Sequence, residues 1–389
     1  MYVAVKGGER AIEASHRILE ATRRGATDVA ALGIAQIREQ LSLLVARVMA
    51  EASVYSPDLA ALAIKQACGD PVEAAFLLRA YRTTLPRFCA SLPLDTEAMR
   101  VRRRVSAISK DLPGGQLLGA TFDYTQRLLD FSLVDEPNEP QPQGSDSRAA
   151  WDRWPTPDED EQAPGAVSSI GLPDALTQLA GEGLIEAARR EPGDPEPPDV
   201  TRDPPGYPMP RAARLQMLAR ADEGWALGMA YSTQRGYAVT HPFAGEIRHG
   251  AVPLRIEPEE LGFAITIGEL ELTECQMVNQ FVGSAEVEPT FTRGYGLALG
   301  SNERRAMSIA LLDRAMRGDE FGERRQAPAQ DQEFTLAHGD CVEASGFVQH
   351  LKLPHYVTFE SEPRSCETCV GRARRRNRCE RPIRSRPHE

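Results

Sequence analysis

Two of the seven histidines stand five positions apart in the segment Phe347–Val357, and a proline directly precedes the second one. An offset of five residues places two side chains about 140° apart on a helix and on opposite faces of a strand. Pro354 changes this geometry, because it fixes its own φ and favours an extended residue before it. The chain must therefore turn between His350 and His355, and imidazoles brought together in this way ligate metals or move protons near neutral pH.

Two unrelated histidines at helix ends would give the same spacing. A zinc ion takes three or four ligands, so a pair alone is too few. His338, Asp340 and Cys341 lie just upstream, and substrate, water or a partner chain are further sources of ligands. The pattern predicts a divalent transition metal, with zinc as one candidate, at His350 and His355.

A lysine and two glycines near the N-terminus form the first of three segments with the composition of a phosphate site. A short apolar stretch leads through Lys6, Gly7 and Gly8 into a predicted helix, which places an ammonium group beside free backbone N–H groups. A plain turn between a strand and a helix would show the same pattern.

The second glycine-rich segment, Leu112–Gly119, leads into a predicted helix that carries Asp123, Tyr124 and Arg127. A loop of this kind presents backbone N–H groups to a phosphate at the start of a helix. The alternative is an ordinary helix entry followed by a solvated Asp123–Arg127 pair at i,i+4, which contributes a few tenths of a kcal/mol.

A tripeptide of arginine, glycine and tyrosine occurs twice, at Arg235–Tyr237 and at Arg293–Tyr295, on either side of the block His241–Arg248. Arginine matches phosphate or phosphonate oxygens with two parallel hydrogen bonds, and tyrosine offers a stacking face. Glycine lets backbone approach a ligand. Two copies flanking one block indicate a site for a phosphorylated ligand, which a single copy would not.

The elements that must position these groups form an α+β pattern, with a largely helical N-terminal half and a mixed α/β C-terminal half. A proline-rich linker separates the halves, since 15 of the 29 prolines lie in residues 135–210. Apolar residues at three and four spacing, bounded by prolines and glycines, predict the helices. The predicted helices are Ala11–Arg24, Ile34–Glu51, Asp58–Ala67, Val72–Thr84, Thr121–Leu133, Leu172–Ala188, Arg211–Tyr231 and Glu303–Arg317, and the predicted strands are Pro253–Glu257 and Phe263–Ile267.

The predicted domain boundaries follow these changes of composition. Residues 1–134 form a mainly helical domain, 135–210 the linker, 211–362 a mixed α+β domain with the histidine pair, and 363–389 a tail. The tail is dense in arginine and lacks apolar periodicity, which predicts disorder. Its three cysteines would also fit half a zinc site or a redox pair.

Composition excludes several classes of protein. With 389 residues, 41% of them hydrophobic, the chain is long enough to bury a core. A net charge of −11 argues against a dedicated nucleic-acid binder. No stretch approaches the ~20 apolar residues that cross a bilayer, and the N-terminus shows no leader, so we expect a cytoplasmic protein without membrane contact. Seven cysteines, an odd number scattered along the chain, suit reduced thiols.

Five blocks of the sequence together resemble one family. The chain is similar, from Met1 to about Phe359 and apart from the linker, to subunit I of the bacterial carbon–phosphorus lyase core complex, the PhnI family. The blocks occur in the order Met1–Glu9, Lys110–Gly119, Tyr231–Tyr237, His241–Arg248 and Phe347–Val357.

The resemblance implies a reaction and a set of partners. In that family's reaction a phosphonate displaces adenine from C1′ of MgATP, giving alpha-D-ribose 1-methylphosphonate 5-triphosphate, and the subunit alone acts as a purine nucleosidase. The implied partners are the G, H and J subunits of the core and its ATP-binding-cassette-type subunits. A non-catalytic scaffold that positions the partner enzymes is the alternative.

Displacement at an anomeric carbon passes through an oxocarbenium-like state, which calls for a carboxylate, an acid for the leaving base and clamps on the anionic groups. Glu274 is a further carboxylate near such groups, and each carboxylate is also compatible with an ordinary ion-paired role. The resemblance places the histidine pair near the face that meets the J subunit. The predicted catalytic residues are His241, Glu246 and Asp123, the substrate-binding residues are Lys6, Gly7, Gly8, Arg235, Arg248 and Arg293, and the metal ligands are His350 and His355.

Overall fold

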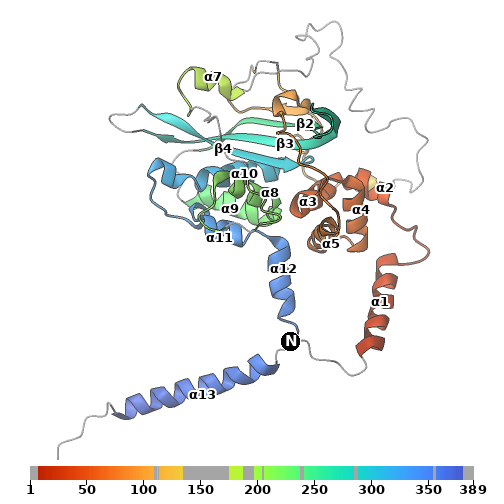
Figure 1. Ribbon diagram of the computed structural model, residues 1–389, viewed down its shortest axis with the longest axis vertical. Coiled ribbons are helices and arrows are strands. Elements are labelled where there is room, and N and C mark those ends of the chain that lie inside the picture. Colours follow the sequence, from red (N-terminus) through yellow and green to blue (C-terminus); the bar gives the residue numbers. More distant parts are fainter. Residues whose placement is uncertain are drawn as a thin grey trace, which may run out of the picture. The chain divides into compact units, whose positions relative to one another are not determined.

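The computed structural model divides the chain into two compact units. The larger unit covers Ala21–Val342, and the smaller one combines residues 1–20 with residues 343–389. Figure 1 shows the course of the chain. The described residues are 8–108, 112, 114–134, 175–186, 197–203, 206–236, 241–283, 288–353 and 356–379.

The larger unit is built on a four-stranded antiparallel sheet in the order β1-β2-β3-β4. The register of β2 against β3 shifts at Gly245 and again between Leu254 and Arg255, and that of β3 against β4 shifts at Gln280. The register of β1 against β2 shifts between Val101 and Arg103, so bulges or irregularities interrupt every strand pair. The strands are β1 Arg100–Val105, β2 Phe243–Ile256, β3 Ile265–Val282 and β4 Thr290–Leu299.

Helices cover one face of this sheet (Figure 1). The helix α10 packs directly on β3 and β4, and its Ala306 and Ala310 join a core cluster with Ile247 and Cys275 of the strands. The short helix α7 packs on the other face, where Leu176 meets strand residues. The helices around the sheet are α7 Ala175–Gly181, α8 Arg211–Arg220, α9 Glu223–Gly236, α10 Glu303–Ala315 and α11 Gln332–Ala337, with 3-10 turns η1 Thr96–Ala98, η2 Phe131–Val134, η3 Gly318–Phe321 and η4 Pro328–Gln330.

The close contact between β4 and α10 depends on two glycines. A Cβ atom on Gly294 would collide with the carbonyl oxygen of Ala310, and one on Gly296 would collide with that of Ala306. Both obstacles are backbone atoms, which cannot move aside as a flexible side chain can. The helix therefore approaches the strand only because both positions lack a side chain.

Four N-terminal helices form a second core. The start of α4 is capped by the Ser56 hydroxyl and that of α5 by the Asp70 carboxylate, each followed by a proline at the first helical position. Alanine-rich faces allow these short helices to pack closely around Ile37 and Val48. The helices are α2 Ile34–Gln40, α3 Ser42–Ala52, α4 Pro57–Gln66 and α5 Pro71–Thr83.

A buried ion pair joins this N-terminal core to the helical layer. Glu51 of α3 and Arg305 of α10 are both fully buried and lie 2.7 Å apart. The same carboxylate accepts hydrogen bonds from Arg47 and from the backbone N–H of Glu223. Because removing one partner would leave a buried charge unpaired, this pair couples the two cores strongly.

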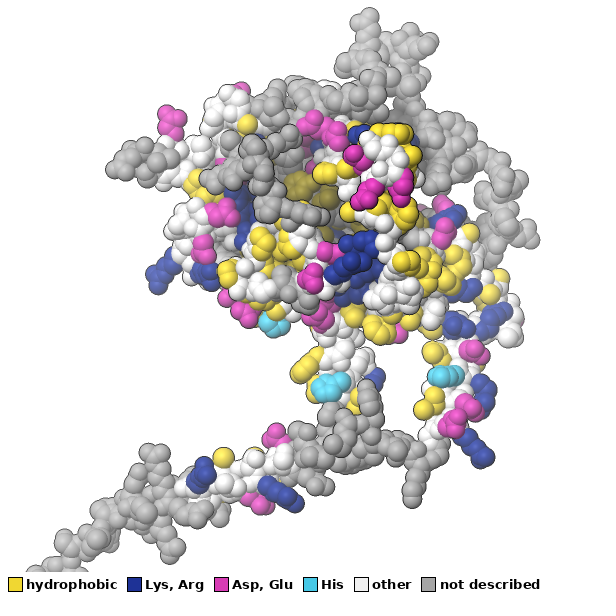
Figure 2. Space-filling view, viewed as in Figure 1, with side chains coloured by type: hydrophobic (Ala, Val, Ile, Leu, Met, Phe, Trp, Pro, Cys, Tyr) yellow, Lys and Arg dark blue, Asp and Glu magenta, His cyan; other side chains and the backbone are white. Residues whose placement is uncertain are grey.

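The smaller unit contains helices that bury few or no side chains. Figure 2 shows charged and apolar side chains side by side along the exposed α1. No helix in the described part of the chain is long and apolar enough to cross a membrane. The helices are α1 Gly8–Arg24, α12 Cys341–His350 and α13 Tyr356–Cys379, of which the ends of α1 and α12 reach into the larger unit.

The α+β prediction is confirmed, and the helices Asp58–Ala67, Val72–Thr84 and Glu303–Arg317 are close to the observed α4, α5 and α10. The helix predicted at Thr121–Leu133 is wrong. That segment forms turns, with Arg127 at φ 57°, because the apolar side chains that suggested a helical face are exposed and have no core to cover.

Other differences concern element length. β2 and β3 are far longer than the predicted strands Pro253–Glu257 and Phe263–Ile267, which overlap only the end of β2 and the start of β3. The charged residues of these strands pair across the sheet and so tolerate burial. The helix predicted at Ile34–Glu51 is interrupted at Leu41, and the one at Arg211–Tyr231 is interrupted at Ala221. In the tail, where composition predicted disorder, α13 continues to Cys379.

Candidate functional site

Side chains alternate along a strand, so the sheet has two chemically different faces. One face contacts α10, and beneath the middle of that helix it is lined by small and apolar residues. The opposite face, here called the polar face, carries charged and hydroxyl side chains from all four strands. In the strand register, Arg104 is opposite Arg248, and Arg248 is opposite Glu274. Glu246 is opposite Gln276, which is in turn opposite Tyr295. The polar face comprises Arg104, Glu246, Arg248, Glu274, Arg293 and Tyr295.

The ion pair between Arg104 and Glu246 is the most deeply buried part of the polar face. Each side chain is 1% exposed, and the two are in direct hydrogen-bonding contact. The second carboxylate oxygen of Glu246 accepts the backbone N–H of Ala175, at the start of α7, at 3.0 Å. Burial raises the pKa of Glu246, and its hydrogen bond with Arg104 opposes that effect.

A second group is centred on Glu274. Its Oε2 lies 2.6 Å from Arg248, and its Oε1 accepts hydrogen bonds from the hydroxyls of Tyr295 at 2.9 Å and Thr96 at 3.0 Å. Burial and the neighbouring Glu274 charge raise the pKa of the Tyr295 phenol, so it remains a proton donor at neutral pH. The arrangement sets a fixed cation, anion and hydroxyl on adjacent strands.

Arg293 differs from the other arginines of the polar face. It lies two residues before Tyr295 on β4, and its buried Nε atom has no hydrogen-bond partner among the described residues. A buried guanidinium nitrogen without a partner is costly, and an oxyanion would satisfy it. Arg293 is therefore the strongest anion-binding candidate on this face.

The structure brings three predicted site residues together on this face, namely Glu246, Arg248 and Arg293. It does not bring Asp123 there. Asp123 contacts Arg103 at 2.6 Å, and Arg103 is paired in register with His249, so both lie on the face opposite to that of Arg104 and Arg248. Hydrogen bonds from Thr121 and Arg103 lower the pKa of the Asp123 carboxyl.

Two further predicted site residues, His241 and Arg235, lie outside the polar face. His241 is exposed, two residues before β2 begins. Arg235 is exposed in the last turn of α9, so the first tripeptide ends a helix whereas the second lies within a strand. Gly8 begins α1, while Lys6 and Gly7 fall outside the described residues.

The glycine of the second tripeptide has a different role from the expected one. We predicted that it lets a ligand approach the backbone, but Gly294 faces α10 and admits the helix. Because successive side chains point to opposite faces, Arg293 and Tyr295 then both project onto the polar face. The glycine of this motif thus allows helix packing, while its arginine and tyrosine belong to the polar face.

The histidine pair is only half described. His350 is the last residue of α12, is exposed, and its Nδ1 lies 2.9 Å from the carbonyl oxygen of Phe347. Pro354 and His355 fall outside the described residues. Within the described ranges, no three His, Cys, Asp or Glu side chains are arranged to hold a metal.

The three upstream candidates for further metal ligands have other contacts. His338 stacks near Trp225 and Phe334, and its Nδ1 lies 2.8 Å from a backbone carbonyl oxygen. Asp340 pairs with Arg79 at 2.7 Å. Burial, with the nearby Glu51 charge, raises the pKa of Cys341 to about 12, so its thiol stays protonated.

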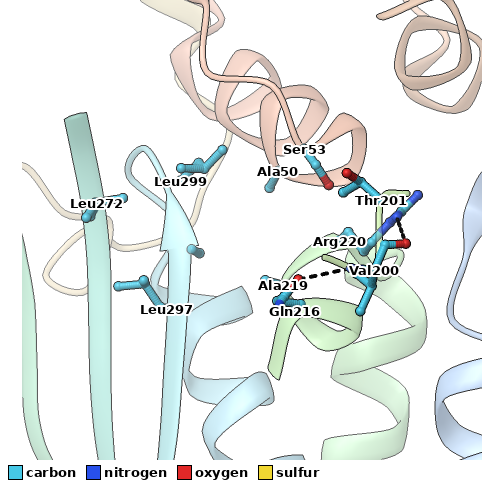
Figure 3. A pocket seen from close by; sticks show the side chains of 11 residues that line it. Ala50, Ser53, Val200, Thr201, Gln216, Ala219, Arg220, Leu272, Leu297 and Leu299 are labelled. Atoms are coloured by element: carbon cyan, nitrogen blue, oxygen red, sulfur yellow. Dashed lines mark hydrogen bonds between the residues drawn. The ribbon is translucent and has the colours of Figure 1, made fainter. Parts of the chain in front are cut away.

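A cavity of about 210 Å³ lies beside β4 where α3 and α8 approach it. Figure 3 shows Ala50 and Ser53 above the cavity, Gln216, Ala219 and Arg220 below and to the right of it, and the leucines of the sheet on the left. Its lining is mostly apolar and contains no carboxylate. It therefore lacks the groups that displacement at a sugar carbon requires.

Sequence reasoning missed Arg104 and Thr96. Arg104 belongs to the run Arg100–Val105, in which arginines dominate a β-strand. An arginine-rich strand leaves cations on the buried faces of a sheet, where they need carboxylates or ligands. That run was the available signal, although the sequence does not show which strand pairs with it.

Comparison with known proteins identifies the family. A family model described as "Bacterial phosphonate metabolism protein (PhnI)" matches residues 1–371. The "Alpha-D-ribose 1-methylphosphonate 5-triphosphate synthase subunit PhnI" of Escherichia coli (strain K12) is 54% identical over 362 residues, which cover 93% of this chain and 96% of the relative. The subunit of the same name from Rhizobium meliloti (strain 1021) is 56% identical over 362 residues, covering 93% of each chain.

A third relative is more distant. The "Putative C-P lyase subunit protein HtxH" of Stutzerimonas stutzeri is 42% identical over 375 residues, covering 96% of each chain. The family match extends beyond Phe359, where the resemblance predicted from the sequence blocks stopped, and into α13. Because these matches span almost the whole chain, the resemblance inferred from five blocks is confirmed, and this protein belongs to the PhnI family of bacterial phosphonate metabolism proteins.

Proposed function

We propose that this chain is a subunit of an alpha-D-ribose 1-methylphosphonate 5-triphosphate synthase, at which a phosphonate displaces adenine from C1′ of MgATP. Family membership and the names of the relatives that are 54% and 56% identical support the synthase assignment. In the proposed step a phosphonate oxygen bonds to C1′, the bond from C1′ to the adenine nitrogen breaks, and the base leaves with a proton.

The observation that carries the proposal is the polar face, where three arginines and two glutamates from four strands share one surface. An oxocarbenium-like state at C1′ is stabilised by a nearby carboxylate, a role for Glu246 or Glu274. Arg248 and Arg293 supply forks for phosphonate or triphosphate oxygens. Both glutamates already bond to arginine, which keeps them oriented before substrate arrives.

The other predicted residues keep their proposed roles. His241 would give a proton to the departing base. Lys6, Gly7, Gly8 and Arg235 would contact the triphosphate. Asp123 is the weakest of the proposed carboxylates, because it does not lie on the polar face but contacts Arg103, which faces the other way from Arg104.

A divalent transition metal at His350 and His355 remains part of the proposal. Exposed imidazole at the end of α12 suits a ligand set completed by a partner chain. Changing either histidine to Ala in the assembled complex should deplete the metal and abolish phosphonate use, and the double change should cost little more than either alone. Small additive effects with unchanged metal content would remove the pair from the site.

The proposed partners are the G, H and J subunits of the core and the ATP-binding-cassette-type subunits. A scaffold without chemistry of its own is the second candidate, favoured by the exposed apolar side chains of α1 and α12. In that case chemistry would take place on another subunit, and changes on the polar face would leave turnover by the complex unaffected.

The test is release of adenine by the purified full-length chain. The chain should convert MgATP slowly to free adenine, measured by chromatography, because the base-leaving site is proposed to lie in this subunit while delivery of the phosphonate needs partners. Arg293→Ala should reduce the rate in a sample that remains folded. Intact nucleotide at high enzyme concentration, together with full phosphonate turnover by a complex containing Arg293→Ala, would instead establish the scaffold.

A further inference from the structure

The strand β4 lies at the edge of the sheet, so half of its backbone groups have no neighbouring strand. Unpaired edge groups attract other chains or leave the strand free to twist. Near its start, β4 is met by a parallel bridge from Ile185 to Phe291. Beyond this point the outward-facing backbone N–H groups of Arg293 and Tyr295 donate to carboxylates, as they would to the carbonyl groups of a fifth strand.

The first carboxylate belongs to Glu186. Its Oε1 accepts the backbone N–H of Arg293 at 2.6 Å. Arg317 donates to both oxygens of Glu186, at 2.8 and 2.9 Å, and its Nη1 also donates to the carbonyl oxygen of Arg293 at 2.8 Å. Both backbone groups of Arg293 are thus fixed by one ion pair.

The second carboxylate belongs to Asp313 of α10. It is fully buried, and its Oδ2 accepts the backbone N–H of Tyr295 at 2.9 Å. Arg211, at the start of α8, donates to both of its oxygens, at 2.9 and 2.6 Å. The carboxylates of Glu186 and Asp313, here called the two clamps, therefore hold alternate residues of β4. Each carboxylate is itself held by an arginine, Arg317 or Arg211.

We propose that Glu186 and Asp313 are positioning residues that set the rotation of β4, and with it the aim of Arg293 and Tyr295 on the polar face. This inference rests on the proposed function of that face. A guanidinium lies about 6 Å from its own Cα, so a rotation of the strand by about 10° moves it by about 1 Å. A displacement of about 1 Å at a reacting group lowers rates by up to about 100-fold.

Ordinary edge protection makes a different prediction from positioning. Protection alone would make the clamps matter for stability and leave ligand binding untouched in any folded variant. If the clamps position side chains, substituting a clamp should affect ligand binding only while the side chain that it orients, Arg293 or Tyr295, is present. This dependence is what a double-mutant cycle measures.

The experiment compares Glu186→Gln in the full-length chain with the same change made on an Arg293→Ala background. Calorimetry gives the Kd for MgATP, and chromatography gives kcat/KM for adenine release. Glu186→Gln should weaken binding and kcat/KM about tenfold in the first background. It should change them less than twofold in the second, because no guanidinium remains to be aimed. Asp313→Asn paired with Tyr295→Phe forms the corresponding cycle for the other clamp.

Two further variants serve as a control and as a replacement for a variant that fails to fold. Glu269→Gln breaks an exposed ion pair with Arg100 on the same sheet, bonds no β4 backbone in the described structure, and should leave every readout unchanged. Arg317→Lys replaces Glu186→Gln if the latter does not fold, because lysine keeps the charge but not the simultaneous bonds to the carboxylate and to the Arg293 carbonyl.

The outcomes separate this inference from the proposed function. Equal losses from Glu186→Gln on both backgrounds would show a general loosening and overturn the positioning role. No loss from Glu186→Gln, with a clear loss from Arg293→Ala, would overturn positioning and leave the proposed function standing. No loss from Arg293→Ala in either readout would overturn the proposed site and the positioning inference with it.

Discussion

The two faces of the sheet are made by alternate residues of the same strands, yet they follow opposite rules. The face toward α10 is closed by small residues, with Gly294 and Gly296 in contact with helix backbone. The polar face holds buried arginines and glutamates that stabilise one another. In the segment Arg293–Gly296, alternate residues of one strand therefore face two different layers, so a short motif with arginine and glycine need not be a phosphate loop.

The strongest test of this comparison is Arg104→Ala, which would show whether the polar face depends on its ion pairs. Arg104 and Glu246 are each 1% exposed, so the change leaves a buried carboxylate without its cation. The free energy of unfolding should fall by about 3 to 5 kcal/mol, measured by chemical denaturation. Combining Arg104→Met with Glu246→Leu should recover most of that loss. A single change costing under about 1 kcal/mol would mean that water reaches the pair.

Gly294→Ala tests the opposite face. The new Cβ atom would collide with the carbonyl oxygen of Ala310, so either the helix or the strand must shift. The free energy of unfolding should fall by about 1 to 3 kcal/mol. Gly268→Ala on β3 is the matched control, because its Cβ would meet nothing within 4 Å and the change should be neutral or slightly stabilising. Equal effects at the two glycines would contradict the close packing of α10.

Arg293→Lys sharpens the distinction between packing and chemistry. Lysine keeps the charge but loses the planar fork, so kcat/KM for adenine release should fall by about 1 to 3 kcal/mol of transition-state stabilisation, roughly 5- to 150-fold. Stability should change little, since Arg293 is only half buried. Arg255→Lys, at an exposed position of β2, serves as the control. Unchanged kinetics would make the second tripeptide purely structural.

The smallest expected effect is a dependence of stability on pH at the β4 edge. Burial disfavours the charged form of Glu186, but hydrogen bonds from Arg317 and from the Arg293 N–H outweigh burial and lower the pKa of its carboxyl. A lowered folded pKa contributes stability above the unfolded value of about 4.3 and loses it as the pH falls. The difference in Tm between the natural chain and Glu186→Gln should therefore be largest near neutral pH and shrink below about pH 4. A constant difference would contradict an ionised Glu186.

The sequence predicted helix starts well where a capping residue and a proline stand next to each other. Ser56 and Asp70 precede prolines and begin α4 and α5 as expected. The segment after Gly119 misled us, because its apolar spacing matched a helix while nothing in the described structure covers it. Periodicity reports an amphipathic face only when a core exists to receive it.

The candidate site was predictable in its residues but not in its assembly. Glu246, Arg248 and Arg293 stand out by type, but their meeting depends on strand register, which several bulges shift. Arg104 lies 142 residues before its partner Glu246, and one sequence gives no sign of such a pairing. The position of Asp123 was unpredictable for the same reason, because Arg103 and Arg104 are adjacent in sequence but face opposite ways.

The short stretch 175–186 has a practical consequence for anyone who wishes to shorten this chain. Composition assigns it to a spacer, yet its first residue, Ala175, bonds the buried Glu246, its Leu176 and Ile185 pack on Val278, and its last residue, Glu186, holds the backbone of Arg293. Although composition places them in the linker, these twelve residues pack on the sheet and hold site residues in place. A trimmed version that removes 175–186 should lose the candidate site, whereas one that retains 175–186 together with 197–210, whose Val200 and Met209 belong to a buried core, should keep the site intact.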